Sequence, residues 1–110
     1  MKVKNLVQEL DLKIIVEGDL EREVSGGYIC DLLSNVMARA KAGDFWFTVQ
    51  GHQNIIAVSL LTDVAGIIVV EDFEIEQDTI KKAEAKAINL FQSSLSAYEL
   101  AGKLYQLGIK

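Results

Sequence analysis

Three short runs of aliphatic, β-branched or aromatic residues recur at a regular spacing and constrain the fold more than any other feature. They begin near residues 45, 66 and 88, and a stretch with helical periodicity follows each. Runs with few alternating polar residues are typical of parallel strands covered on both faces. Alternation of strand and helix predicts right-handed βαβ crossovers. We expect one α/β domain over residues 1–110, with three-layer-like βα repeats on a mainly parallel sheet and these three strands adjacent or nearly so.

The first of these runs predicts how its strand sits in the sheet. Phe45 and Phe47 alternate with Trp46, so Trp46 should point to the opposite side of the strand. A sheet covered by helices on both faces accommodates all three rings.

The segment before residue 45 contains two predicted helices and two predicted strands. Apolar residues at helical spacing predict a helix over 3–10, and a branched run predicts a strand over 12–16. A second short strand is expected over 21–25, interrupted by Gly26 and Gly27. The clearest helical period then predicts a helix from about Tyr28 to Lys41, with Ile29, Leu32, Leu33, Val36, Met37 and Ala40 on its buried face.

Three more helices are predicted between and after the main strands. A nearly all-apolar helix should begin near Gln53, and Asp78 should cap the next helix, whose Ile80, Ala83 and Ala87 share one face. Ser96, with Glu99 three residues later, forms a capping-box pattern ahead of the last helix.

Composition excludes several classes of function. A net charge of −5 has the wrong sign for a chain that follows a phosphate backbone, so we expect no nucleic-acid partner. Every apolar stretch is far shorter than a membrane helix, so we expect no membrane partner. One cysteine and no recognisable leader point to a cytoplasmic protein without disulfides.

Four loops at the predicted carboxyl ends of strands are the candidate ligand sites, because open parallel sheets bind ligands there. They cover residues 25–28, 48–54, 71–78 and 92–96. Free N–H groups before helices favour anions, but the first, second and fourth loops hold no Lys or Arg and the third carries five acidic residues. A neighbouring chain or a metal would therefore have to supply the cation. Ordinary turn and cap chemistry remains the alternative. The candidate ligand-binding residues are Gly26, Gly27, Tyr28, Thr48, Gln50, Gly51, His52, Asn54, Ser93, Ser94 and Ser96.

No residue pattern predicts catalysis. His52 is the only histidine and fits a solvated or capping role; Cys30, in the first turn of a predicted helix, fits a small buried hydrophobic role. One Cys and one His cannot bind a structural zinc ion, and Glu71 with Asp72 is a weak magnesium pattern inside an acidic loop. The phosphate-loop pattern is missing, since Gly102-Lys103 is followed by Leu104. We expect no catalytic residue, cofactor or metal.

Several short motifs agree in order and spacing with a known family. They are Val24-Ser25-Gly26-Gly27-Tyr28, Cys30 to Met37, Trp46 to Gln50, Asn54-Ile55, Ser96 to Glu99 and Leu107-Gly108-Ile109. In these the chain resembles the stand-alone DRTGG-domain proteins of anaerobic bacteria. The resemblance implies an α/β fold similar to the N-terminal domain of HPr kinase/phosphorylase and a regulatory or ligand-sensing role, as in modules beside CBS domains in some pyrophosphatases. The loop aligned with the naming motif, Thr48 to Asn54, has a single glycine and no Asp-Arg pair.

Two classes of function follow. The first is a non-catalytic regulatory module that senses a small ligand, such as a nucleotide or phosphorylated metabolite, or binds a partner protein. The alternative is a small enzyme that uses His52 or Cys30. We also expect a homodimer, because 50% hydrophobic residues and a mean hydropathy of +0.21 exceed what a small core comfortably buries, and because the resemblance implies pairing.

Overall fold

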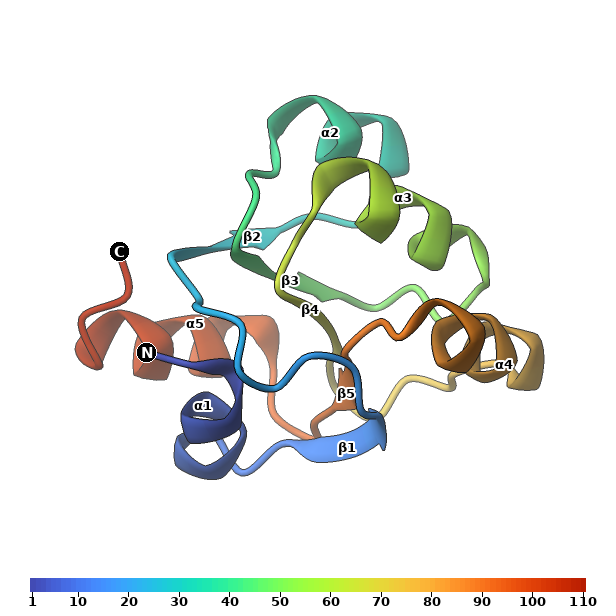
Figure 1. Ribbon diagram of the computed structural model, residues 1–110. Coiled ribbons are helices and arrows are strands. Elements are labelled where there is room, and N and C mark those ends of the chain that lie inside the picture. Colours follow the sequence, from blue (N-terminus) through green and yellow to red (C-terminus); the bar gives the residue numbers. More distant parts are fainter.

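A five-stranded sheet lies between two layers of helices in the computed structural model, which describes residues 1–110 (Figure 1). Helices α2, α3 and α4 cover one face of the sheet, and α1 and α5 cover the other. The elements are α1 (Val3–Glu9), β1 (Lys13–Val16), β2 (Gly26–Ile29), α2 (Leu33–Arg39), β3 (Asp44–Thr48), α3 (Asn54–Thr62), β4 (Gly66–Val69), α4 (Gln77–Lys86), β5 (Leu90–Gln92) and α5 (Ala97–Gln106).

The strand order β1-β5-β4-β3-β2 confirms the predicted parallel core of the sheet. The three strands β3, β4 and β5 are adjacent and parallel, with Trp46 opposite Ile67 and Ile67 opposite Leu90. Strand β2 extends the parallel sheet beyond β3, whereas β1 pairs with β5 in the antiparallel direction. The two edges of the sheet are therefore β1 and β2.

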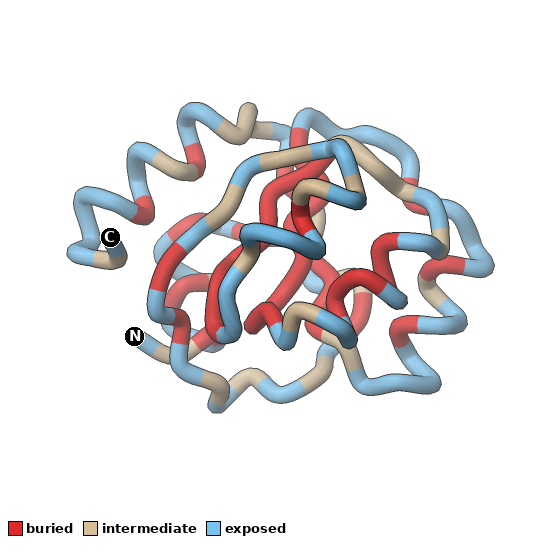
Figure 2. Tube along the Cα trace, turned by 90° about the horizontal axis from the view of Figure 1, so that it is seen from above, coloured by how far each residue is buried: buried red, intermediate tan, exposed pale blue.

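Side chains of β3 enter two separate hydrophobic cores. Phe45 and Phe47 pack toward α1 and α5, and Trp46 packs toward α2, α3 and α4. All three rings are at most 1% exposed, and the Trp46 indole donates a hydrogen bond to the Cys30 carbonyl at 2.9 Å. The predicted alternation is confirmed, and Figure 2 shows that buried residues concentrate in the strands and on the inner sides of the helices.

The predicted structure of residues 21–41 is wrong in two respects. Residues 21–25 form no strand; Glu23 makes only an isolated bridge with Lys2. Gly26, Gly27 and Tyr28 do not precede or begin a helix but form β2. The missing side chains explain the error, since a Cβ on Gly27 would lie 3.2–3.3 Å from side-chain atoms of α5 and β3, and one on Gly26 would lie 2.7 Å from an Asp44 carboxylate oxygen. Glycine lets this edge strand approach its neighbours closely.

The helix in this region is correspondingly shorter than predicted. It begins at Leu33, and of its predicted apolar face only Val36 is fully buried. Ile29 is 51% exposed on the edge strand, Leu32 is 66% exposed ahead of the helix, and Met37 is 51% exposed. A regular helical period in the sequence here spans a strand end, a loop and a helix, so it does not describe one buried face.

The predicted helix caps differ in outcome. Ser96 accepts a hydrogen bond from the Glu99 backbone, and the Glu99 carboxylate accepts one from the Ser96 backbone, which confirms the capping box of α5. Asp78 does not cap α4: Glu76 is the N-cap residue, and Asp78 lies in the first turn. Ala87, predicted to share a helical face, follows α4 in the left-handed conformation.

Asn89 joins three segments at the amino ends of the parallel strands. Its side-chain oxygen accepts from the Gly18 backbone at 2.8 Å, and its amide nitrogen donates to the carbonyls of Asp19 and Ala65 at 2.8 and 2.9 Å. The residue is 5% exposed, so water cannot easily replace these bonds. Asn89 therefore fastens the loop after β1 to the start of β4.

Replacing Asn89 with alanine should destabilise the domain strongly. Loss of the amide leaves the Gly18 N–H and the Ala65 carbonyl unpaired near the core, so we expect a loss of about 1–3 kcal/mol in the free energy of unfolding. Urea unfolding followed by circular dichroism measures it. The exposed Asn5→Ala control should stay within about 0.5 kcal/mol of the wild type. Equal stability of the two variants would contradict this role of Asn89.

Candidate functional site

The loop after β3 is held by hydrogen bonds within the protein. The Asp31 carboxylate accepts from the Thr48 hydroxyl at 2.8 Å and from the Val49 backbone at 2.9 Å. Gln50 donates from its side-chain amide to the Asp31 carbonyl at 3.2 Å. Thr48 is only 2% exposed. These hydrogen bonds stabilise the crossover from β3 to α3. Because the polar groups bond to one another, few of them remain free to bind a ligand.

The rest of this loop also makes contacts within the protein. A Cβ on Gly51 would collide with the Glu74 carbonyl oxygen, so glycine permits the contact between this loop and the loop before α4. The Gly51 carbonyl accepts from the Thr79 hydroxyl at 2.7 Å. His52 accepts through Nδ1 from the Asn54 backbone at 3.2 Å, a capping role at the start of α3. Of the sequence candidates, Thr48, Gln50, Gly51, His52 and Asn54 line no pocket.

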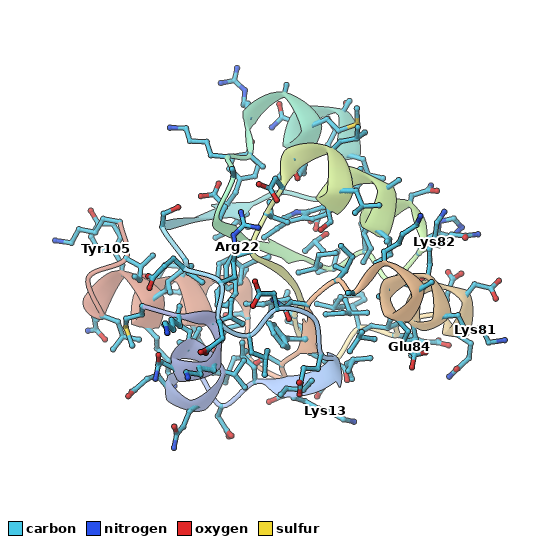
Figure 3. The ribbon with its side chains drawn as sticks, viewed as in Figure 1. Lys13, Arg22, Lys81, Lys82, Glu84 and Tyr105 are labelled. Atoms are coloured by element: carbon cyan, nitrogen blue, oxygen red, sulfur yellow. The ribbon has the colours of Figure 1, made fainter.

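A pocket of about 430 Å³ lies at the carboxyl end of β5 and includes two other candidates, Ser93 and Ser94. The Ser93 hydroxyl accepts a hydrogen bond from the Leu95 backbone at 3.1 Å and is nearly buried, whereas Ser94 is exposed. Ser96 lies beyond the pocket and caps α5. The charged side chains around it are Asp11, Lys13, Asp72 and Lys103, and Figure 3 labels Lys13 beside β1. Two lysines face two aspartates, so these charges balance.

A second pocket, of about 470 Å³, surrounds the candidates Gly26, Gly27 and Tyr28. It lies at the amino end of β2. Because β2 is parallel to β3, this is the opposite end of the strands from the loops that follow β3, β4 and β5. The candidate residues consequently do not converge on one site. The charged residues that line this pocket are Arg39, Lys41, Lys110 and Asp44.

Cations dominate the pocket at Gly26. Arg39, Lys41 and Lys110 form no ion pair with any carboxylate of the chain. Asp44 is 7% exposed, and its carboxylate accepts a hydrogen bond from the Lys41 backbone at 2.9 Å. Three cations without carboxylate partners, beside one carboxylate that already accepts a hydrogen bond, favour an anion at this position.

Sequence analysis missed these cations, because it considered only basic residues inside the loops. Arg39 ends α2, Lys41 follows it, and Lys110 comes after α5. The fold brings these segments to the edge strand. The one sign of this site in the sequence is that two basic residues, Arg39 and Lys41, lie close together in the segment between the two glycines and the next strand.

The two candidate nucleophile or base residues lie apart from both pockets. Cys30 was predicted to lie in the first turn of a helix, but it follows β2 instead. Its sulfur lies 3.6 Å from the Asn35 amide nitrogen, and the residue packs partly against the core. Asn35 also donates to the Tyr28 hydroxyl at 2.8 Å. Neither Cys30 nor His52 lines a pocket in which a substrate could meet it.

Metal ligands do not cluster in the structure. Glu71 and Asp72 form a tight turn in which both residues have positive φ, and no group of three or more His, Cys, Asp or Glu side chains could hold a metal ion. None of the helices has the length and apolar character needed to cross a membrane.

Comparison with known proteins identifies the family. The DRTGG domain model matches residues 5–107. No curated protein sequence matches the chain. A crystal structure of the CBS and DRTGG domains of the regulatory region of Clostridium perfringens pyrophosphatase, complexed with its activator diadenosine tetraphosphate, has a similar fold. The TM-score is 0.76 at 15% sequence identity, over 96% of this chain and 46% of that one. The chain belongs to the DRTGG domain family.

Proposed function

We propose that this domain is a non-catalytic regulatory module that senses a small anionic ligand, of the class of nucleotides and phosphorylated metabolites. One observation carries the proposal: three cations without carboxylate partners surround Gly26 and Gly27 in a pocket of about 470 Å³. That volume falls within the range of about 300–1,000 Å³ common for small-molecule sites. The similar CBS and DRTGG regulatory region, which binds a nucleotide activator, supports this ligand class.

The residues of the pocket suit phosphate chemistry. Arg39 offers a planar guanidinium that can donate two parallel hydrogen bonds, and Lys41 and Lys110 add two more positive charges, with the Lys110 ammonium 5.2 Å from the centre of the Tyr105 ring. The cations that residues 25–28 lack therefore come from other segments of the same chain, and neither a metal nor a neighbouring chain is needed to supply them.

Binding at this pocket would connect parts of the fold that have few direct contacts. Arg39 and Lys41 flank the end of α2 on one face of the sheet, and Lys110 follows α5 on the other. A ligand held by all three cations would tie the two helical layers together at the edge of the sheet. We propose that this connection is how occupancy is communicated to a partner.

We further propose that the module acts in the cytoplasm as a homodimer. The single cysteine forms no disulfide, which suits a reducing compartment. Large apolar side chains remain exposed, among them Ile29, Leu61, Tyr98 and Tyr105. A second copy of the chain would cover part of this surface.

Ligand binding should raise thermal stability. A nucleotide or phosphorylated metabolite present at 100 times its Kd should add about 2.7 kcal/mol to the free energy of unfolding. A thermal-shift screen of nucleoside mono-, di- and triphosphates, dinucleoside polyphosphates and sugar phosphates measures it. The absence of any shift across the screen would count against a phosphate-sensing role.

Removing two cations of the pocket should abolish that stabilisation. Arg39→Ala with Lys41→Ala deletes two charge-assisted donors, each worth about 1.5–3 kcal/mol, so we expect affinity to fall at least about a hundredfold. Isothermal titration calorimetry with a ligand from the screen measures it. The matched control is Lys81→Ala with Lys82→Ala on α4, which removes equal charge away from the pocket (Figure 3). Equal losses in both double variants would show that net charge, and not this pocket, governs binding.

The domain should not transfer phosphate to serine. It has no phosphate loop to hold a triphosphate, and its only histidine uses Nδ1 as a helix cap. Incubation of pure protein with labelled ATP and a serine-containing substrate protein tests this. Reproducible transfer that is lost in His52→Ala or Cys30→Ala would favour the small-enzyme alternative instead.

A further inference from the structure

Helix α5 contains a glycine that the isolated chain does not explain. Gly102 lies in the interior of the helix, where glycine is less stable than alanine because it loses more backbone freedom. A Cβ built on Gly102 would meet no atom within 4 Å. By contrast, Gly18, Gly51 and Gly66 each lie against backbone or ring atoms that a side chain would crowd.

The outer face of α5 around this glycine is apolar and exposed. Tyr98, Ala101, Gly102 and Tyr105 follow the spacing i, i+3, i+4, i+7, so they form one stripe. Tyr98 is 88% exposed and Tyr105 is 60% exposed. The buried residues Leu100 and Leu104 face the sheet instead. Figure 3 shows Tyr105 at the C-terminal end of α5.

The stripe forms a groove that continues onto the sheet edge. A surface groove of about 610 Å³ is lined by Tyr98, Ala101, Gly102 and Tyr105 together with polar neighbours. Ala101 and Tyr105 also line an adjoining pocket of about 150 Å³, which reaches the half-exposed Ile29 of the edge strand β2. The apolar surface is thus broader than one helix.

We propose that this groove binds α5 of a second copy of the chain, with the two helices antiparallel and crossing at Ala101 and Gly102. The inference rests on the proposed homodimer and names its surface. The tyrosines lie at the two ends of the stripe and the small residues at its middle. In an antiparallel pair, Tyr98 of one copy lies beside Tyr105 of the other, and the small residues let the two backbones approach closely.

Charges beside the groove match this arrangement and identify a second copy as the occupant. Glu99 and Lys103 both line it, on the same side of the stripe. Antiparallel pairing about a two-fold axis between the helices brings Glu99 of one copy to Lys103 of the other, whereas parallel pairing would place the charges of the two copies on opposite sides of the interface. Lys103 forms no ion pair within the chain, and Glu99 uses only Oε1 for the capping box. The groove is therefore complementary to itself.

Sedimentation equilibrium of the full chain over a wide concentration range tests the groove. The wild type should approach twice 12.1 kDa as concentration rises. Gly102→Leu should weaken self-association at least about tenfold, because the side chain holds the helices apart. Ala85→Leu, which enlarges an exposed small residue in α4, should leave self-association unchanged.

A second pair of variants tests the charge pairing if Gly102→Leu should fail to fold. Lys103→Glu should weaken self-association by opposing two carboxylates, and adding Glu99→Gln should partly restore it, because glutamine keeps the capping box without the charge. A wild type that stays at 12.1 kDa throughout would refute both the homodimer and this surface. A wild-type dimer unaffected by Gly102→Leu and Lys103→Glu, or equally weakened by Ala85→Leu, would refute the α5 surface alone.

Discussion

Burial of β3 on both faces is the constraint on which the rest of the fold depends. All five residues of this strand are buried, with Phe45 and Phe47 in one core and Trp46 in the other. Neither face can be left to water, because each aromatic side chain removes a large apolar area from solvent. Helices must therefore lie on both sides, and short βαβ crossovers achieve this while keeping the strands parallel.

This constraint also decides where a ligand can bind. Asp31 and Thr79 form hydrogen bonds with polar groups of the crossover after β3, and the Glu74 carbonyl fills the space beside Gly51. The conventional site at the carboxyl edge is consequently filled by the protein itself over residues 48–54. Open space remains where the sheet ends, beside the edge strands β1 and β2. At β2 that space is bordered by cations from two helical layers.

The sequence predicted the parts of the fold that are governed by local period and burial. The runs at Phe45, Gly66 and Ile88 became adjacent parallel strands, and the Ser96 capping box formed as its pattern indicated. It failed at Gly26 and Gly27, because glycines that usually mark turns are used here to fit an edge strand against Asp44, Phe47 and Leu104. It could not place the cations, because Lys110 reaches the glycine pair only through the packing of α5 on the sheet. Long-range placement of this kind leaves no periodic signal.

We infer that an anion binds at the amino end of β2 and not at the carboxyl ends of the parallel strands. Chemical-shift mapping of the ¹⁵N-labelled chain with inorganic tripolyphosphate tests it most directly, because every backbone amide of β2 and of the loops reports separately. We expect the largest perturbations at Gly26, Gly27 and Lys41, and we expect them to disappear in the variant with Arg39→Ala and Lys41→Ala. Perturbations confined to residues 92–96, or unchanged in that variant, would contradict it.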